Sequence, residues 1–257
     1  MRIITCFKWV LDERDLKIDP KSCALLTDRA KKKISEYDRN ALECGVKLIE
    51  EHGGEVVALT AGTADAKNSL KDALSRGPSE AFFVKDEIMK EVDPGTSAKI
   101  LAAAAQQIGA FDLIVCGIGS SDGYSQQVGI RLAQHLDIPV VTFVNKVSVV
   151  SGVLRAERKL DEGIEVVEVN LPAVITVLPD LNTPRIPSLK QILGAAKKPV
   201  KEVSIAELGM DSEALRSKVR RQNVQGAIME RKRIRFTGDA DAIVAQAVDV
   251  LKKEGLC

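Results

Sequence analysis

The chain has 257 residues, of which 45% are hydrophobic and 28% are charged. These proportions are ordinary for a globular protein and exclude intrinsic disorder as the main description of the chain. The 37 Lys and Arg residues nearly balance the 36 Asp and Glu residues, so the net charge is only +1. This balance argues against a dedicated nucleic-acid-binding protein, which usually carries a basic excess.

The first part of the chain alternates short apolar runs with amphipathic stretches. Glycine or proline ends several of the stretches, as at residues 53–54 and 77–78. The predicted strands span residues 2–7, 55–60, 80–84 and 112–116, and the predicted helices span residues 37–51, 64–75, 96–108 and 124–136. This order is typical of an α/β, Rossmann-like fold, which has a parallel sheet with helices on both faces.

The pattern changes after Pro139, where β-rich runs follow one another with little helix between them. Turn signals stand at residues 151–152 and 161–163. The predicted strands here span residues 140–144, 146–150, 153–158 and 165–170. We expect them to be antiparallel strands added to the edge of the sheet. Residues 173–178 are uniformly apolar apart from one threonine and predict a further core strand.

The last part of the chain has a different character from about Leu181 onward. Prolines at positions 184, 187 and 199 punctuate it, and residues 200–236 show no clean period. Residues 239–253 predict a helix with an apolar stripe. We therefore predict an α/β domain over residues 1–180 and an arm over residues 181–257 that needs a partner surface. The alternative is an ordinary tail that folds back on its own domain.

The cysteines and histidines do not form a metal-binding pattern. Five cysteines at positions 6, 23, 44, 116 and 257 include no CxxC pair, and the two histidines, His52 and His135, lie far apart. We expect reduced thiols in or near the core and no metal site. No apolar run reaches the roughly 18 residues that cross a bilayer, and the start of the chain, interrupted by Lys8, is not a signal peptide. These features predict a cytoplasmic protein without a membrane span.

Small and polar residues gather where the predicted parallel strands end. Ligands of open parallel sheets bind beyond these carboxyl ends. The candidate positions are Cys6 after the first strand, Ser35, Glu36, Tyr37 and Asp38 at the start of the first helix, Ala61 after the second strand, and the loop that begins at Gly117.

The loop after residues 112–116 is the most informative of these strand ends. Three glycines within residues 117–123 let the backbone approach a ligand, and Ser120, Ser121 and Ser125 add hydroxyl groups. The following helix would direct unpaired N–H groups toward an anion. The spacing is GxGxxxG and not the dinucleotide pattern GxGxxG, so a phosphate cradle and an ordinary strand-to-helix turn both remain open. No nucleophile elbow or zinc-protease motif occurs in the sequence, and we predict no catalytic side chain.

Several segments resemble the beta subunit of electron-transfer flavoproteins. Residues 156–176, AERKLDEGIEVVEVNLPAVIT, fit the family's signature throughout. Residues 35–43, SEYDRNALE, are similar to its N-P-[YF]-D-x-x-A-[IL]-E segment without the Asn-Pro pair, and residues 182–190 resemble its N-x-P-R-Y-x-x-L stretch. Lys8-Trp9-Val10 matches the Lys-x-Val step after the first strand.

This resemblance implies a nucleotide-binding subunit that forms a heterodimer with an FAD-bearing alpha subunit. Simpler members hold AMP as a structural part, whereas bifurcating members hold a second FAD that accepts hydride from NADH. The implied cofactor-binding positions coincide with the strand ends chosen above. They are Cys6, Ser35, Glu36, Tyr37, Asp38, Ala61, Gly117, Ser120, Ser121, Asp122, Gly123, Tyr124, Ser125, Gln126, Gln127, Val128, Gly129 and Arg131.

The loop sequence favours FAD over AMP in this comparison. AMP-type members have a D-D-D-x-N-Q-T-G loop, whereas residues 122–129 read DGYSQQVG. A glycine after Asp122 leaves room for a pyrophosphate that a second carboxylate would repel. The phrases CGxGSSDxYxQQVG, LSRGP and IPSxKxILGAAKKPV resemble members linked to anaerobic acyl-CoA reductases of the carnitine and caffeyl-CoA type. The resemblance therefore implies transfer from NADH to an acyl-CoA dehydrogenase or reductase and to ferredoxin or flavodoxin.

A short stretch near Leu189 resembles the family's recognition loop for the partner dehydrogenase. Leu189 would be its apolar anchor and Lys190 a neighbouring charge. An ordinary amphipathic surface helix would have the same pattern. For the chain as a whole, the sequence also leaves open a non-bifurcating subunit in which AMP only stiffens the fold. A third hypothesis is an independent adenine-nucleotide sensor, which would have to be stable as a monomer, and the arm after Leu181 argues against it.

Overall fold

The computed structural model describes residues 1–219, 222–228 and 231–256. Its main feature is a nine-stranded sheet with the strand order β11-β10-β9-β12-β8-β1-β6-β7-β13. The strands are β1 (Arg2–Cys6), β6 (Glu55–Gly62), β7 (Glu80–Lys85), β8 (Leu113–Gly117), β9 (Val140–Val150), β10 (Val153–Leu160), β11 (Gly163–Asn170), β12 (Ala173–Val177) and β13 (Val200–Val203). The pairs β9–β12, β12–β8, β8–β1, β1–β6, β6–β7 and β7–β13 are parallel. The pairs β9–β10 and β10–β11 are antiparallel.

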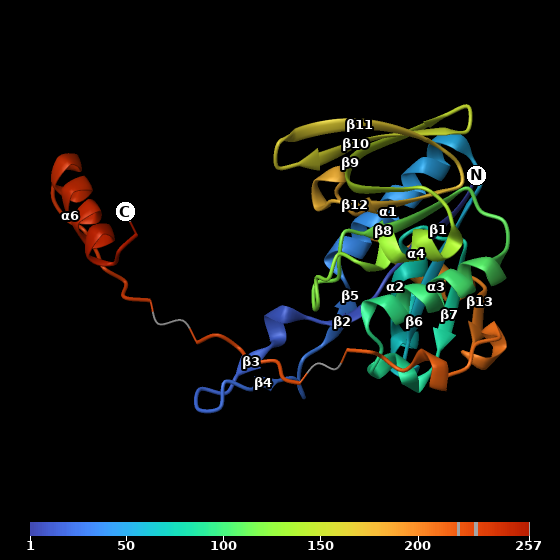
Figure 1. The fold of residues 1–257 in the computed structure, drawn as a ribbon, viewed down its shortest axis with the longest axis horizontal. Coiled ribbons are helices and arrows are strands. Elements are labelled where there is room, and N and C mark those ends of the chain that lie inside the picture. Colours follow the sequence, from blue (N-terminus) through green and yellow to red (C-terminus); the bar gives the residue numbers. More distant parts are fainter. Residues whose placement is uncertain (220–221, 229–230, 257) are drawn as a thin grey trace. The chain divides into compact units, whose positions relative to one another are not determined.

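Helices cover both faces of the parallel part of the sheet (Figure 1). Because successive strand residues face opposite sides, Ile3 packs in a core with α1, whereas Ile4 packs in a core with α3 and α4. The helices are α1 (Glu36–His52), α2 (Lys67–Ser75), α3 (Pro94–Ile108) and α4 (Val128–Leu136). The predicted α/β, Rossmann-like parallel sheet with antiparallel edge strands is confirmed.

The described residues also form two small two-stranded sheets and six 3₁₀ turns. β2 (Trp9–Leu11) pairs with β5 (Lys32–Ile34), and β3 (Lys17–Ile18) forms a second two-stranded sheet with β4 (Leu25–Leu26). The 3₁₀ turns span Glu13–Asp15, Ala64–Ala66, Glu87–Lys90, Pro179–Leu181, Ala206–Leu208 and Glu213–Leu215. The β2–β5 pair was not predicted from the sequence.

The predicted helix over residues 124–136 is wrong at its start. α4 begins only at Val128, because Tyr124 and Gln126 have positive φ angles of 40° and 57°. Side chains adopt this left-handed region rarely, and a helix cannot pass through it. The two predicted strands at 140–144 and 146–150 are one strand, β9, whose pairing is interrupted by a register shift near Phe143, a residue with φ of 59°.

The chain forms two compact units. One contains Met1–Lys17 with Leu26–Asn223, and the other contains Ile18–Leu25 with Val224–Cys257. Within the first unit, residues after Leu181 form α5 (Leu189–Ala195) and then β13, which pairs with β7. In the second unit, Asp239 caps α6 (Ala240–Lys253) by accepting the Ala242 N–H at 2.9 Å, and this confirms the predicted helix.

Candidate functional site

The site candidates lie at the point where the strand order reverses. β1 has β6 on one side and β8 on the other, and the chain continues from β1 to β6 and β7 before it returns to β8 and β12. Such a reversal leaves a crevice at the carboxyl ends of the two central strands. In this protein those ends are Cys6 of β1 and Gly117 of β8.

Asp38, in the first turn of α1, connects these two strand ends. Its carboxylate accepts the Lys8 N–H at 2.9 Å, and the backbone of Gly117 supplies a further hydrogen bond. A Cβ on Gly117 would lie 2.6 Å from Asp38 Oδ1 and 2.8 Å from the Tyr37 carbonyl carbon. The close approach of α1 to β8 therefore requires glycine at position 117.

The environment of Asp38 changes its acidity. Only 7% of the residue is exposed, and burial raises its pKa to about 7 although the Lys8 amide and the Lys8 charge oppose this change. The sequence interpretation placed Asp38 among the ligand-binding residues. In the structure its carboxylate accepts hydrogen bonds from the backbone at both strand ends, and a contact of Asp38 with a ligand stays a prediction.

The loop between β8 and α4 closes over the start of α1. Asp122 forms an ion pair with Lys8 at 2.6 Å and accepts the Gly123 N–H at 2.7 Å. Burial is the largest influence and disfavours the Asp122 carboxylate, but the Lys8 charge and the hydrogen bonds from Lys8, Ser120 and the Gly123 amide together outweigh it and lower the pKa of Asp122. The Tyr124 ring lies 5.1 Å from the ring of Tyr37, at an interplanar angle of 42°. The loop and the first turn of α1 therefore form one structure.

Two serines mark the inner side of this loop. The Ser121 N–H donates to Ser35 Oγ at 3.3 Å, and Ser35 is fully buried. The Ser121 hydroxyl is buried, and within the described part of the chain it has no hydrogen-bond partner. Because buried polar groups in native proteins are almost always paired, this hydroxyl is suited to a ligand that accepts a hydrogen bond.

α4 follows the loop and packs closely on β12. A Cβ on Gly129 would lie 2.5 Å from Thr176 Cγ2, so the helix approaches the sheet closely at this position. Arg131 donates from Nε to Gln127 Oε1 at 3.1 Å and holds the first turn of the helix. The first N–H groups of an α-helix have no partner within the helix. In α4 these groups directly follow the loop, because the helix begins at Val128.

Two further predicted positions lie at the strand ends without joining the loop. Cys6 and Cys116 are buried neighbours on β1 and β8, and their mutual hydrogen bond, together with burial, raises the pKa of the Cys6 thiol. Ala61 lies near the end of β6, where it packs against the core between the sheet and α3. The cysteines at 6, 23, 44 and 116 form no disulfide, and Cys257 lies outside the described residues.

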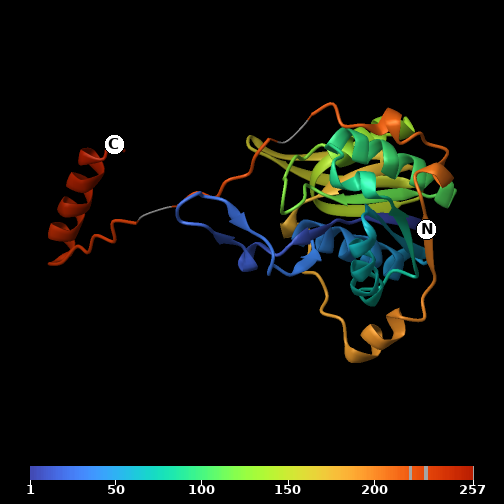
Figure 2. The same ribbon diagram turned by 90° about the horizontal axis from the view of Figure 1, so that it is seen from below.

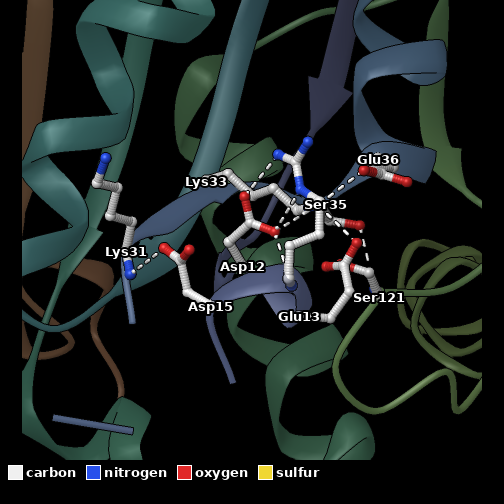
Figure 3. A network of polar contacts seen from close by, with 9 residues as sticks. Asp12, Glu13, Asp15, Lys31, Lys33, Ser35, Glu36 and Ser121 are labelled. Carbon is white, nitrogen blue, oxygen red and sulfur yellow. Dashed lines mark hydrogen bonds and ion pairs between the residues drawn. The ribbon is translucent and has the colours of Figure 1, made fainter. Parts of the chain in front are cut away.

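A polar network supports the start of α1 from the β2–β5 pair (Figure 3). Lys33 of β5 is only 6% exposed, and its ammonium group contacts the carboxylates of Glu36 at 2.7 Å, Glu13 at 2.8 Å and Asp12 at 3.3 Å. Burial opposes the charge of Lys33, but the hydrogen bonds to these carboxylates outweigh it and raise its pKa. Arg14 pairs with Asp12 at 2.7 Å.

The structure connects seven of the eighteen predicted positions directly. Hydrogen bonds, ring packing and close backbone approaches connect Ser35, Tyr37, Asp38, Gly117, Ser121, Asp122 and Tyr124. The sequence interpretation noted Lys8 at the end of the first strand without giving it a role, and it missed Lys33. The charged sequence around Lys33 gives no sign that this side chain is buried.

A cavity of about 480 Å³ lies beside the first turn of α1. It is lined by four residues of the first turns of α1 (Glu36, Tyr37, Arg39 and Asn40), by Arg76, and by Pro179 and residues 184–187. The Arg39 Nε is buried, and among the described residues it has no hydrogen-bond partner.

The sheet order, the reversal at β1 and β8 and the loop before α4 are those of a Rossmann-like α/β protein, a class whose ligands bind where the strand order reverses. A family model described as the electron transfer flavoprotein domain matches residues 23–208. The chain belongs to the electron transfer flavoprotein family. This family is associated with flavin and nucleotide cofactors and works with a heterodimer partner. Among the described residues, no helix has the length and apolar character that crossing a membrane needs.

Proposed function

We propose that this protein is the beta subunit of an electron transfer flavoprotein and that it binds FAD at the β1–β8 crevice. The observation that carries the proposal is the buried, unpartnered hydroxyl of Ser121 in the loop that closes over Ser35 and Tyr37. A hydroxyl in this position can donate to a phosphate oxygen of the cofactor. Gly123 adds no side chain beside it.

The charge of the loop supports a diphosphate in this site. Asp122 is the acidic side chain in the loop over residues 117–127, and its ion pair with Lys8 neutralises it. A second carboxylate at position 123 would add repulsion of about 4 kcal/mol for two charges 4 Å apart at an effective dielectric constant of about 20. The glycine at this position removes that repulsion, and it favours FAD over AMP.

The residues of this chain would bind and orient the cofactor and would not carry protons. Ser121 and the backbone of residues 118–125 would hold phosphate groups, and Tyr37 and Tyr124 would border the site. A flavin held by these residues would supply the redox chemistry, with NADH as the electron donor. Through the alpha subunit these electrons would reach an acyl-CoA dehydrogenase or reductase, and ferredoxin or flavodoxin would take the low-potential electron.

The partner surfaces follow from exposed apolar side chains. Leu189 in α5 is 71% exposed, and with Lys190 it would form the contact with the dehydrogenase. On α6, Val244 and Leu251 are exposed at 60% and 43% within their own unit. We propose that residues 181–257 serve partner binding in this way and that α6 packs on the alpha subunit.

Cofactor counting in the purified heterodimer tests the proposal. Two flavins per heterodimer, with bleaching of the flavin absorbance by NADH, are the expected result. One flavin together with one AMP released by acid would instead identify the non-bifurcating type, in which AMP is structural. A chain that binds adenine nucleotide and stays monomeric with its alpha subunit present would contradict both.

Variants of the loop connect the cofactor count to the site. Lys8→Ala leaves Asp122 without its counter-charge, and we expect the cofactor bound in this subunit to fall by more than half. Lys146→Ala is the matched control, because Lys146 forms a similar pair with Glu157 at 2.9 Å on β9 and β10. Equal cofactor contents in the two variants would contradict the assignment of the site.

A further inference from the structure

The α5 segment, residues 186–197, presents apolar side chains with little core of its own. Ile186 is 93% exposed, Leu189 71% and Leu193 62%, and within α5 only Ala195 is buried. Figure 2 shows this segment in orange, away from the sheet. A helix of seven residues is not stable by itself in water, so other contacts must fix its position.

Arg185 fixes the start of the segment to α1. Its guanidinium contacts both oxygens of Glu43, with Nε to Oε2 at 2.7 Å and Nη2 to Oε1 at 3.1 Å, and its own N–H donates to Oε2 at 3.0 Å. The same guanidinium contacts Glu50 at 2.7 and 3.0 Å. Glu43 is only 4% exposed. These are charge-assisted, bidentate contacts, which are the strongest and most directional kind.

Two asparagines extend this attachment toward the nucleotide end of α1. Asn40 donates to the Asn182 carbonyl at 2.8 Å and to the Pro179 carbonyl at 3.0 Å. Asn182 donates in return to the Asn40 carbonyl at 3.0 Å. The positions 40, 43 and 50 lie on one side of α1, and the first turn of the same helix carries Ser35 to Asp38 at the crevice.

Lys198 fixes the end of the segment to the turn after α2. Its ammonium group donates to the carbonyls of Leu74 at 2.8 Å, Gly77 at 3.3 Å and Pro78 at 2.6 Å. Burial lowers its pKa. Three carbonyl acceptors match the three donors of an ammonium group, so the side chain is fully used by this one contact.

We infer that Arg185 and Lys198 are positioning residues that hold the α5 segment ready for docking, in a fixed relation to the nucleotide end of α1. The inference rests on the proposed docking role of α5. A preset segment loses little conformational entropy when the partner binds, and this raises affinity without any new contact. Neither side chain is itself part of the exposed apolar surface.

Hydrogen exchange in the intact heterodimer tests the positioning directly. The variants are Arg185→Met and Lys198→Met, with Arg185→Lys as the conservative change and Arg155→Met as a control. Arg155 lies on β10 and is paired only loosely with Glu168, at 3.8 Å. In both Met variants we expect amide exchange in peptides covering residues 186–197 to rise about tenfold, with an intermediate rise for Arg185→Lys and none for Arg155→Met.

Steady-state electron transfer to an acyl-CoA dehydrogenase supplies a second readout. We expect the KM for the dehydrogenase to rise about fivefold in the two Met variants, with kcat and the cofactor content unchanged. A general loss of folding would instead lower the cofactor content and the thermal midpoint together. Unchanged exchange in residues 186–197 would overturn the inference, and so would an unchanged KM in variants whose exchange has risen.

Leu189→Ala separates the inference from the proposed function beneath it. A raised KM in this variant supports docking through α5, and Arg185→Met is then expected to match it in direction. A KM unaffected by Leu189→Ala would refute the docking role itself, and the exchange result would still decide whether Arg185 and Lys198 hold the segment in place.

Discussion

Replacing Asp38 by Asn removes a buried carboxyl group whose acidity the fold changes strongly. Folding raises the pKa of Asp38 from 3.8 to about 7, mainly through burial. Between these two pH values the folded protein holds a proton that the unfolded chain has released. The contribution of Asp38 to stability is therefore fully present below about pH 4, and it is lost as the pH rises toward 7.

The size of this effect follows from the two pKa values. They differ by about 3, and at roughly 1.4 kcal/mol for each unit the free energy of unfolding would fall by about 4 kcal/mol across the window. In Asp38→Asn the amide oxygen still accepts the Lys8 N–H, and the side chain does not titrate. The stability difference between wild type and variant should therefore shift toward the variant by up to about 4 kcal/mol between pH 4 and pH 8.

Urea unfolding at a series of pH values from 4 to 8 measures this difference. Other titrating groups, such as Asp12 and Glu13 with their lowered pKa values, change stability in the opposite direction. They are present in both proteins and cancel in the comparison. A difference that stays constant over the whole range, or that shifts toward the wild type as the pH rises, would refute the assignment of a raised pKa to Asp38.

Three further substitutions probe the packing around the site. In Gly117→Ala the new methyl group overlaps Asp38 Oδ1 and the backbone of Tyr37. We expect the free energy of unfolding in urea to fall by about 3 kcal/mol and most of the bound cofactor to be lost. Retained cofactor would contradict the role of this close approach. In Gly129→Ala the methyl group overlaps Thr176, and thermal unfolding should show a loss of about 2 kcal/mol. Lys33→Met leaves the carboxylates of Asp12, Glu13 and Glu36 without their shared cation, although two of them can hydrate. Urea unfolding should therefore show a loss of stability of about 2 kcal/mol, and this loss should shrink as the pH falls to 4. A loss independent of pH would count against the electrostatic explanation.

The sequence predicts the parallel part of the sheet well because its strands are buried on both faces. β8 is a continuous apolar run, β1 is apolar apart from Arg2 and Thr5, and nearly all residues of both strands are buried. Amphipathic spacing identifies α3, which buries one side. It also identifies α1 from its apolar residues, although residues 40–46 of this helix are all buried. These patterns arise from the burial of hydrophobic side chains, which contributes much of the folding free energy. Such burial can be predicted from the residue types and their spacing.

The elements that the sequence does not predict are held mainly by polar contacts. The buried residue at the centre of β5 is a lysine, Lys33, although lysine is among the residues least often found inside proteins. α5 has a single buried side chain and is fixed by Arg185 and Lys198. Some of these polar contacts join residues more than a hundred positions apart, and others join a strand to a neighbouring turn. The local hydrophobic pattern of the sequence therefore does not reveal them.

The candidate site depends both on apolar strands, which the sequence predicts, and on polar contacts, which it does not. Only part of the site could therefore be predicted. Its location follows from strand order, and the loop composition predicts where small and polar residues gather. Its shape depends on positive φ angles at Tyr124 and Gln126 and on the Lys8–Asp122 pair, which local propensity does not encode. Tyr124 accepts its unfavourable backbone because the Tyr37 ring packs against it and its N–H reaches the Ser120 carbonyl at 2.9 Å. The start of α1 therefore sets the conformation of the loop, and Arg185 attaches the segment before α5 to the same helix.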